Sequence, residues 1–116
     1  KTRLVWDVAP RHRLAEQWIF GTVEVIIPFE SEEEALEMGN WNDYGFGARL
    51  WNANGARQMR LGKTVKSGEV FIHNYGAGGG VELAFGGRGL SGHGREKGFE
   101  ALYGFSSLKT VASYHG

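Results

Sequence analysis

TVEVIIPF, residues 22–29, and SEEEALEMG, residues 31–39, decide the fold of this chain of 116 residues. In the first stretch every second residue is apolar, so one face of an extended chain is apolar, and the other face also carries an apolar residue. This pattern predicts a well-buried strand. The second opens with Ser31 and places Glu34 three residues later, a capping box that predicts the start of a helix. Gly39 is expected to end that helix. A strand that leads directly into a helix is typical of an α/β fold.

The same alternation continues along the chain. Residues 45–51 are a second strand candidate, and Asn54 is expected to cap a helix that runs to about Val65. Residues 69–74, rich in apolar and β-branched side chains, predict a third strand. The order strand, helix, strand, helix, strand predicts an α/β layer with crossover connections.

Glycine dominates the next part of the chain. The chain has 19 glycines, and many of them fall in residues 76–98, which predicts a long loop. Residues 87–92 read G-x-G-x-x-G, but no strand comes directly before them, so a loop is favoured over a dinucleotide-binding turn. Residues 95–105 predict a helix, and residues 108–114 predict a short terminal strand.

Composition excludes several classes of function. Thirteen basic and thirteen acidic residues cancel, which gives no electrostatic reason to expect nucleic acid or an anionic membrane as partner. The chain has no cysteine, so it has no thiolate metal site and no cysteine nucleophile, and we expect a cytoplasmic location. The four histidines lack helical ligand spacing, and no metal site is expected. For His73, a satisfied polar group at a strand end is favoured over a pocket position.

Several stretches together resemble the NAD(P)-dependent aldehyde dehydrogenase family. They are FESEEEA at 29–35, NDYGF at 42–46, SGEVFI at 67–72, FGG at 85–87, SGHGRE at 91–96, AL at 101–102 and KTV at 109–111. The last four stand in the order and at the spacing of the family's C-terminal signature. The resemblance covers essentially the whole chain and corresponds to about the last quarter of a typical family member.

This resemblance implies a role in oxidising an aldehyde to a carboxylic acid through a cysteine thiohemiacetal, with NAD or NADP as cofactor. The nucleophile, the general base and the Rossmann domain are expected upstream of Lys1, so no catalytic residue is expected here and the isolated chain is predicted to be inactive. Residues 1–106 correspond to the end of the catalytic domain, and residues 107–116 to an oligomerisation strand. The expected partner is a second copy or a complementary dehydrogenase chain. The alternative is a non-catalytic, dehydrogenase-derived interaction module that assembles through the same strand.

The resemblance also assigns site residues. The family motif E-x-F-G-P holds the nicotinamide ribose, and here it places Phe20 at the cofactor and Trp18 at the position of the ribose-binding glutamate. Indole has one donor and no acceptor, so the usual ribose contact is not expected, and no cofactor is expected to bind tightly to this chain alone. Asn74, Tyr75 and Phe85 are expected to border the aldehyde tunnel.

Overall fold

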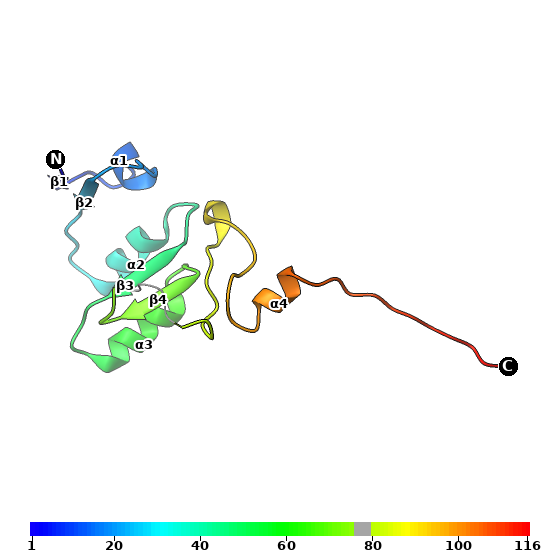
Figure 1. Ribbon diagram of the computed structural model, residues 1–116. Helices are drawn as coiled ribbons and strands as arrows, with labels where there is room; N and C mark the ends of the chain where they lie inside the picture. The colour runs from blue at the N-terminus through cyan, green and yellow to red at the C-terminus, as the bar shows by residue number, and fades with distance from the viewer. Residues whose placement is uncertain (76–79) are drawn as a thin grey trace. The chain divides into compact units, whose positions relative to one another are not determined.

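The computed structural model describes residues 1–75 and 80–116. Its elements are β1 (Arg3–Trp6), α1 (Arg13–Glu16), β2 (Val23–Ile26), α2 (Glu32–Asn40), β3 (Gly47–Leu50), α3 (Gly55–Thr64), β4 (Glu69–Ile72), the 3-10 turn η1 (Gly89–Ser91) and α4 (Ala101–Gly104) (Figure 1). They divide into two compact units, Lys1–Asn42 and Asp43–Gly116. The predicted α/β class is confirmed.

The first unit contains a parallel pair of strands, β1 and β2. Arg3 lies opposite Val23, and Trp6 lies opposite Ile26. Parallel neighbours need a crossover connection, and α1 lies within that connection. Neither β1 nor α1 is predicted from the sequence, and β2 is shorter than the strand expected over residues 22–29. His12 starts α1, because its Nδ1 accepts a hydrogen bond from the backbone N–H of Leu14 at 3.2 Å.

The capping box at the start of α2 is confirmed. Ser31 Oγ accepts a hydrogen bond from the backbone N–H of Glu34 at 3.1 Å. The Glu34 carboxylate in turn accepts one from the backbone N–H of Glu30 at 2.7 Å. The prediction that Gly39 ends the helix is wrong, since α2 continues to Asn40 and Trp41 is its C-cap residue.

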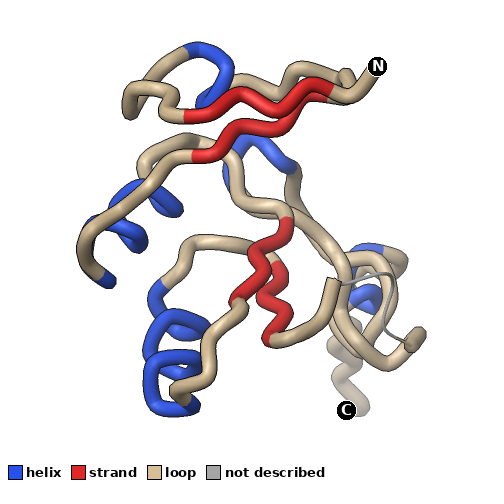
Figure 2. Tube along the Cα trace, turned by 90° about the vertical axis from the view of Figure 1, so that its left-hand side faces the viewer, coloured by secondary structure: helices blue, strands red, loops and turns tan. Residues whose placement is uncertain are grey.

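The second unit contains the parallel pair of β3 and β4, with α3 as the crossover between them (Figure 2). Asn54 caps α3 as predicted, since its Oδ1 accepts a hydrogen bond from the backbone N–H of Arg57 at 3.0 Å. α3 packs against both strands. Within the described residues, β2 pairs with β1, so the four strands form two two-stranded sheets, each with a parallel pair.

The C-terminal part departs most from prediction. The helix expected over residues 95–105 shrinks to α4, because Lys97 and Gly98 adopt left-handed φ angles of 61° and 64° that interrupt a right-handed helix. Residues 106–116 are exposed and form no strand within the chain. A strand forms only against a partner, so the oligomerisation strand stays a prediction.

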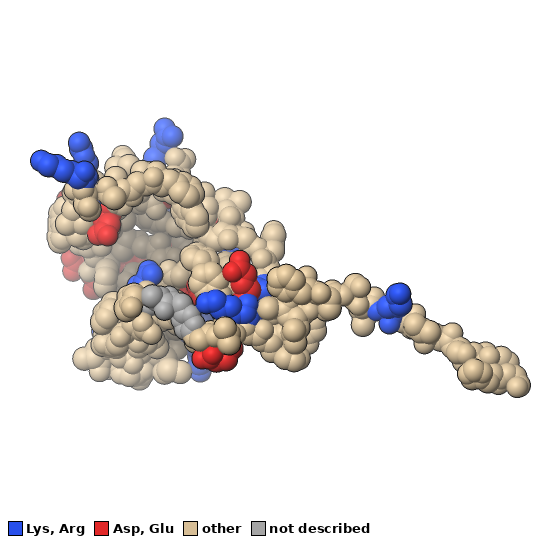
Figure 3. Space-filling view, viewed as in Figure 1, with Lys and Arg blue, Asp and Glu red and all other residues tan. Residues whose placement is uncertain are grey.

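The chain exposes a large surface. Its solvent-accessible area is 9330 Å², against about 6,300 Å² expected for a folded monomer of this mass. Among the described residues, Val8 is the only hydrophobic side chain that counts as buried. Most of the surface visible in Figure 3 is neither acidic nor basic. No helix in the described ranges is long and apolar enough to cross a membrane. The large accessible area and the scarcity of buried hydrophobic side chains show that the apolar side chains of these elements are not covered within the described part of the chain.

Candidate functional site

A pocket of about 320 Å³ lies in the unit Asp43–Gly116. It is lined by three aromatic rings, several glycines and a small set of polar side chains. The lining residues are Phe46, Phe85, Gly86, Gly87, Ser91, His93, Gly94, Arg95, Glu96, Gly104 and Phe105. Apolar walls with a few polar groups are the usual make-up of a small-molecule site.

Phe85 is the best-fixed ring of this pocket. Its backbone exchanges two hydrogen bonds of 2.7 Å with Glu96 across an antiparallel bridge. Its ring meets Phe46 edge to face, with centroids 5.3 Å apart and an interplanar angle of 89°. The Lys97 ammonium lies 5.0 Å from the centre of the Phe85 ring, within the range of a cation–π contact. The backbone and the ring of Phe85 are therefore both held in place.

The loop that follows Phe85 is bonded to the start of β3. The Gly45 carbonyl accepts hydrogen bonds from the backbone N–H groups of Arg88 and Gly68, both at 3.0 Å. The Gly45 N–H donates to Ser91 Oγ at 3.1 Å. A Cβ on Gly68 would overlap the carbonyl oxygen of Gly86, so glycine is required where these backbones meet. This bonding fixes one wall of the pocket.

The G-x-G-x-x-G stretch at residues 87–92 forms this loop. It contains the 3-10 turn η1, with Gly89 at a φ of 59°, and it does not open an α-helix. A pyrophosphate site needs a strand before the motif and the N-terminus of a helix after it. The loop interpretation is therefore confirmed.

His73 lies at the end of β4 and outside the pocket lining. Its Nε2 lies 2.8 Å from the carbonyl oxygen of Asn52 and 3.1 Å from Gln58 Nε2. The indole of Trp51 meets the imidazole edge to face at 5.4 Å. His73 is thus a satisfied polar group at a strand end, which confirms the favoured interpretation. Among the described residues, no three His, Cys, Asp or Glu side chains come together as metal ligands.

The three residues predicted to border an aldehyde tunnel are only partly brought together. Phe85 lies in the pocket, whereas Asn74 and Tyr75 follow β4 and are exposed. Arg49 Nε donates a hydrogen bond of 2.6 Å to the carbonyl oxygen of Tyr75. Arg49 was not among the residues predicted from the sequence, because its bond to Tyr75 joins positions 26 residues apart.

The two residues predicted at the cofactor lie in the unit Lys1–Asn42. The rings of Trp18 and Phe20 meet edge to face, with centroids 5.6 Å apart and an interplanar angle of 67°. Phe20 has a left-handed φ of 49°, and the residue is 89% exposed. Its ring is therefore open to a flat group, but the indole beside it still offers no acceptor for a ribose hydroxyl.

Comparison with known sequences gives a consistent result. The model of the aldehyde dehydrogenase family matches residues 2–111. The NADP/NAD-dependent aldehyde dehydrogenase PuuC of Escherichia coli (strain K12) is 42% identical over 105 residues, which cover 90% of this chain and 21% of that protein. Human retinaldehyde dehydrogenase 3 is 37% identical over 105 residues, again 90% of this chain but 20% of that protein. The chain thus spans about a fifth of the length of the curated relatives it matches.

Solved structures agree with this match. A crystal structure from Burkholderia cenocepacia with the same family designation is 58% identical, with a TM-score of 0.88 over 97% of this chain and 24% of that one. The indole-3-acetaldehyde dehydrogenase AldA of P. syringae, in complex with NAD+ and IAA, is 31% identical, with a TM-score of 0.87 over 93% of this chain and 22% of that one. The prediction of a partial family fold is confirmed.

Proposed function

Because this chain belongs to the aldehyde dehydrogenase family, we propose that it is the C-terminal segment of an NAD(P)-dependent enzyme that oxidises an aldehyde to a carboxylic acid. The family match covers nearly the whole chain but about a fifth of each relative. The chain also has no cysteine to form a thiohemiacetal. The nucleophile, the general base and the dinucleotide-binding domain therefore come from polypeptide outside these residues. The isolated chain is inactive under this proposal.

The contribution of this segment is to shape the aldehyde site. Phe85, Asn74 and Tyr75 border the substrate in this proposal, and the backbone bridge and ring contacts of Phe85 support a rigid wall. Rigid walls orient a substrate and exclude water from the reacting carbonyl. Phe20 presents an exposed ring to the cofactor. Trp18 does not fit the ribose, since an indole accepts no hydrogen bond, so we assign no step to that contact.

The exposed surface supports a need for further polypeptide. The chain shows about 3,000 Å² more surface than a folded monomer of its mass. An interface buries surface on both partners, so covering this excess would bury about 6,000 Å² in total, at or above the top of the usual range of obligate interfaces, about 2,000–5,000 Å². We propose that the rest of the enzyme, and a second copy paired through residues 107–116, cover it. Because residues 106–116 are exposed and unpaired within the chain, their backbone groups are available for such pairing.

A chimera tests this function. Residues 1–116 replace the matching segment of the E. coli relative, and NADH or NADPH formation is measured with a series of aldehydes. The isolated chain and a chimera that lacks the host's nucleophilic cysteine serve as controls. We expect turnover by the chimera alone. A chimera that folds and assembles but oxidises no aldehyde would contradict the proposal.

The alternative is a non-catalytic interaction module. Trp18 favours it, because this residue replaces the acceptor expected at the ribose. A module of this kind forms a stable assembly by itself and gives an inactive but folded chimera. Turnover by the chimera therefore separates the two functions, because the first predicts aldehyde oxidation and the second predicts a folded chimera without it.

A further inference from the structure

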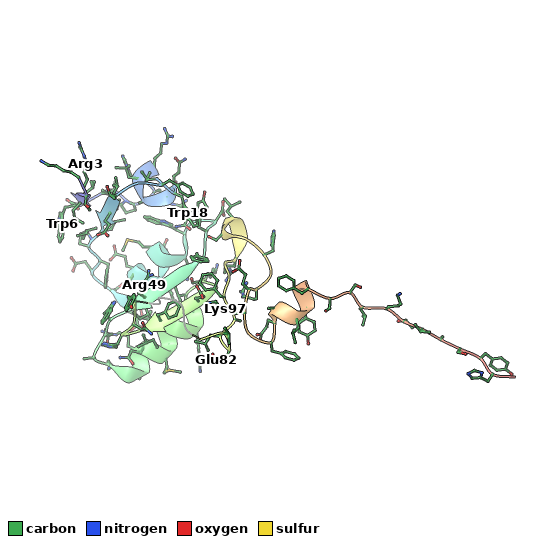
Figure 4. The ribbon with its side chains drawn as sticks, in the orientation of Figure 1. Arg3, Trp6, Trp18, Arg49, Glu82 and Lys97 are labelled. Carbon is green, nitrogen blue, oxygen red and sulfur yellow. The ribbon has the colours of Figure 1, made fainter. Side chains whose placement is uncertain are left out.

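Arg49 occupies an unusual place in the second unit. It lies on β3, opposite Phe71 in the ladder, and its side chain is exposed (Figure 4). Its Nε donates a hydrogen bond of 2.6 Å to the carbonyl oxygen of Tyr75, which follows the end of β4. This bond ties the guanidinium to the segment that borders the aldehyde site in the proposed function.

The bond through Nε leaves the outer edge of the guanidinium available. The two Nη groups carry four further N–H donors in a fixed plane. Across the part of the chain that the structure describes, no carboxylate pairs with Arg49. A planar fork of this kind matches a carboxylate through two parallel hydrogen bonds.

Two other cations of the same unit are already engaged within the chain. Arg95 Nη1 donates to the carbonyl oxygens of Gly87 and Gly94, at 2.8 and 2.6 Å, so it supports the pocket wall. The Lys97 ammonium lies over the Phe85 ring. Among the described residues, Arg49 is thus held through Nε, while its two Nη groups keep their hydrogen-bond donors.

We propose that Arg49 binds an anionic group of the substrate, and that the substrate is an aldehyde with a carboxylate at its far end. This inference rests on the proposed function, which places Tyr75 at the aldehyde site. One guanidinium balances one negative charge, which favours a carboxylate over a phosphate dianion. A distant carboxylate is bound equally in the ground state and the transition state, so it lowers KM more than it raises kcat.

The test compares succinic semialdehyde with butanal in the chimera, before and after Arg49→Met. Both probes have the same carbon chain, and only the first carries a carboxylate. We expect kcat/KM for succinic semialdehyde to fall about 10- to 100-fold, mainly through KM, since a charged hydrogen-bonded pair is lost. Butanal should change by less than about twofold. Lys63→Met is the matched control, because it removes an exposed positive charge from α3 of the same unit.

Three results overturn the inference. The first is an equal fall of kcat/KM for both aldehydes in Arg49→Met, which would mark Arg49 as a support for Tyr75. The second is an unchanged kcat/KM for both aldehydes. The third is an equal kcat/KM for the two probes before mutation. Arg49→Lys should recover only part of the preference, because an ammonium lacks the planar fork. Calorimetric titration with succinate gives a readout without turnover, and its binding should weaken in Arg49→Met. An active chimera without a preference for the carboxylate refutes this inference alone, whereas a chimera inactive with every aldehyde refutes the proposed function.

Discussion

Replacement of Gly68 by alanine should loosen the loop that forms one wall of the pocket. A Cβ at this position would overlap the carbonyl oxygen of Gly86 and approach its carbonyl carbon to 3.0 Å and the Gly87 Cα to 3.1 Å. All three are backbone atoms, so no side-chain rotation relieves the overlap. The loop must move away from Gly68 as a body.

The cost follows from the contacts that this movement breaks. The hydrogen bonds from Arg88 N–H to the Gly45 carbonyl and from Gly45 N–H to Ser91 Oγ hold the loop, and each contributes about 0.5–1.5 kcal/mol. Overpacking adds about 1–3 kcal/mol. The lower entropy of the unfolded alanine chain returns about 0.4–1 kcal/mol. The net loss of local stability is about 1–6 kcal/mol.

Hydrogen exchange of the chimera, followed by mass spectrometry, measures this loss in peptides that cover residues 84–92. Exchange should accelerate about fivefold or more, the equivalent of about 1 kcal/mol at 1.36 kcal/mol per tenfold. Gly62→Ala is the matched control, because a Cβ there lies 4.0 Å from the side chains of Ile72 and Val70, an ordinary contact distance. The replacement of a glycine within a helix also raises stability by about 0.8–1.0 kcal/mol. Unchanged exchange in Gly68→Ala would refute the reasoning.

Three further predictions concern the cap, the cofactor and assembly. Ser31→Ala should destabilise the first turn of α2 by about 1 kcal/mol, because the side-chain cap is lost. The loss should appear as faster hydrogen exchange in that turn, with Ser107→Ala as control. Equal exchange in both variants would show that the cap contributes little. Trp18→Glu in the chimera should tighten NAD+ binding about tenfold, because a carboxylate restores a hydrogen-bond acceptor for the ribose hydroxyls. Equal NAD+ affinities of the chimera before and after this substitution, measured by calorimetry, would contradict the assignment of position 18 to the ribose. The isolated chain should associate at micromolar concentration in analytical ultracentrifugation, because its apolar faces are uncovered; a stable monomer would contradict this.

Elements that depend on local hydrogen bonds could be predicted from the sequence. Ser31 and Asn54 each bond to a backbone N–H three residues later, so the residues that start α2 and α3 stand close together in the chain. β1 was missed because its stability depends on pairing with β2, about twenty residues away. The helix over residues 95–105 was overextended because apolar spacing carries no information about the left-handed backbone at Lys97 and Gly98.

The site residues divide in the same way, into those that local sequence indicates and those that depend on tertiary contacts. Phe85 was assigned to the aldehyde tunnel from its resemblance to a family motif. It lines a pocket in the structure, and the tunnel assignment stays a prediction. The antiparallel bridge to Glu96 and the bond from Arg49 to the Tyr75 carbonyl are tertiary contacts that no local pattern encodes. Trp18 was readable as a departure from the motif, since its chemistry depends on the side chain alone.

The most direct test of the account is one assay of NADH formation, with the isolated chain and the chimera measured side by side on the same aldehydes. We expect turnover by the chimera and none by the chain, because the chain has no cysteine nucleophile and covers about a fifth of the length of its relatives. Turnover by the purified chain, or a folded chimera without turnover, would contradict it.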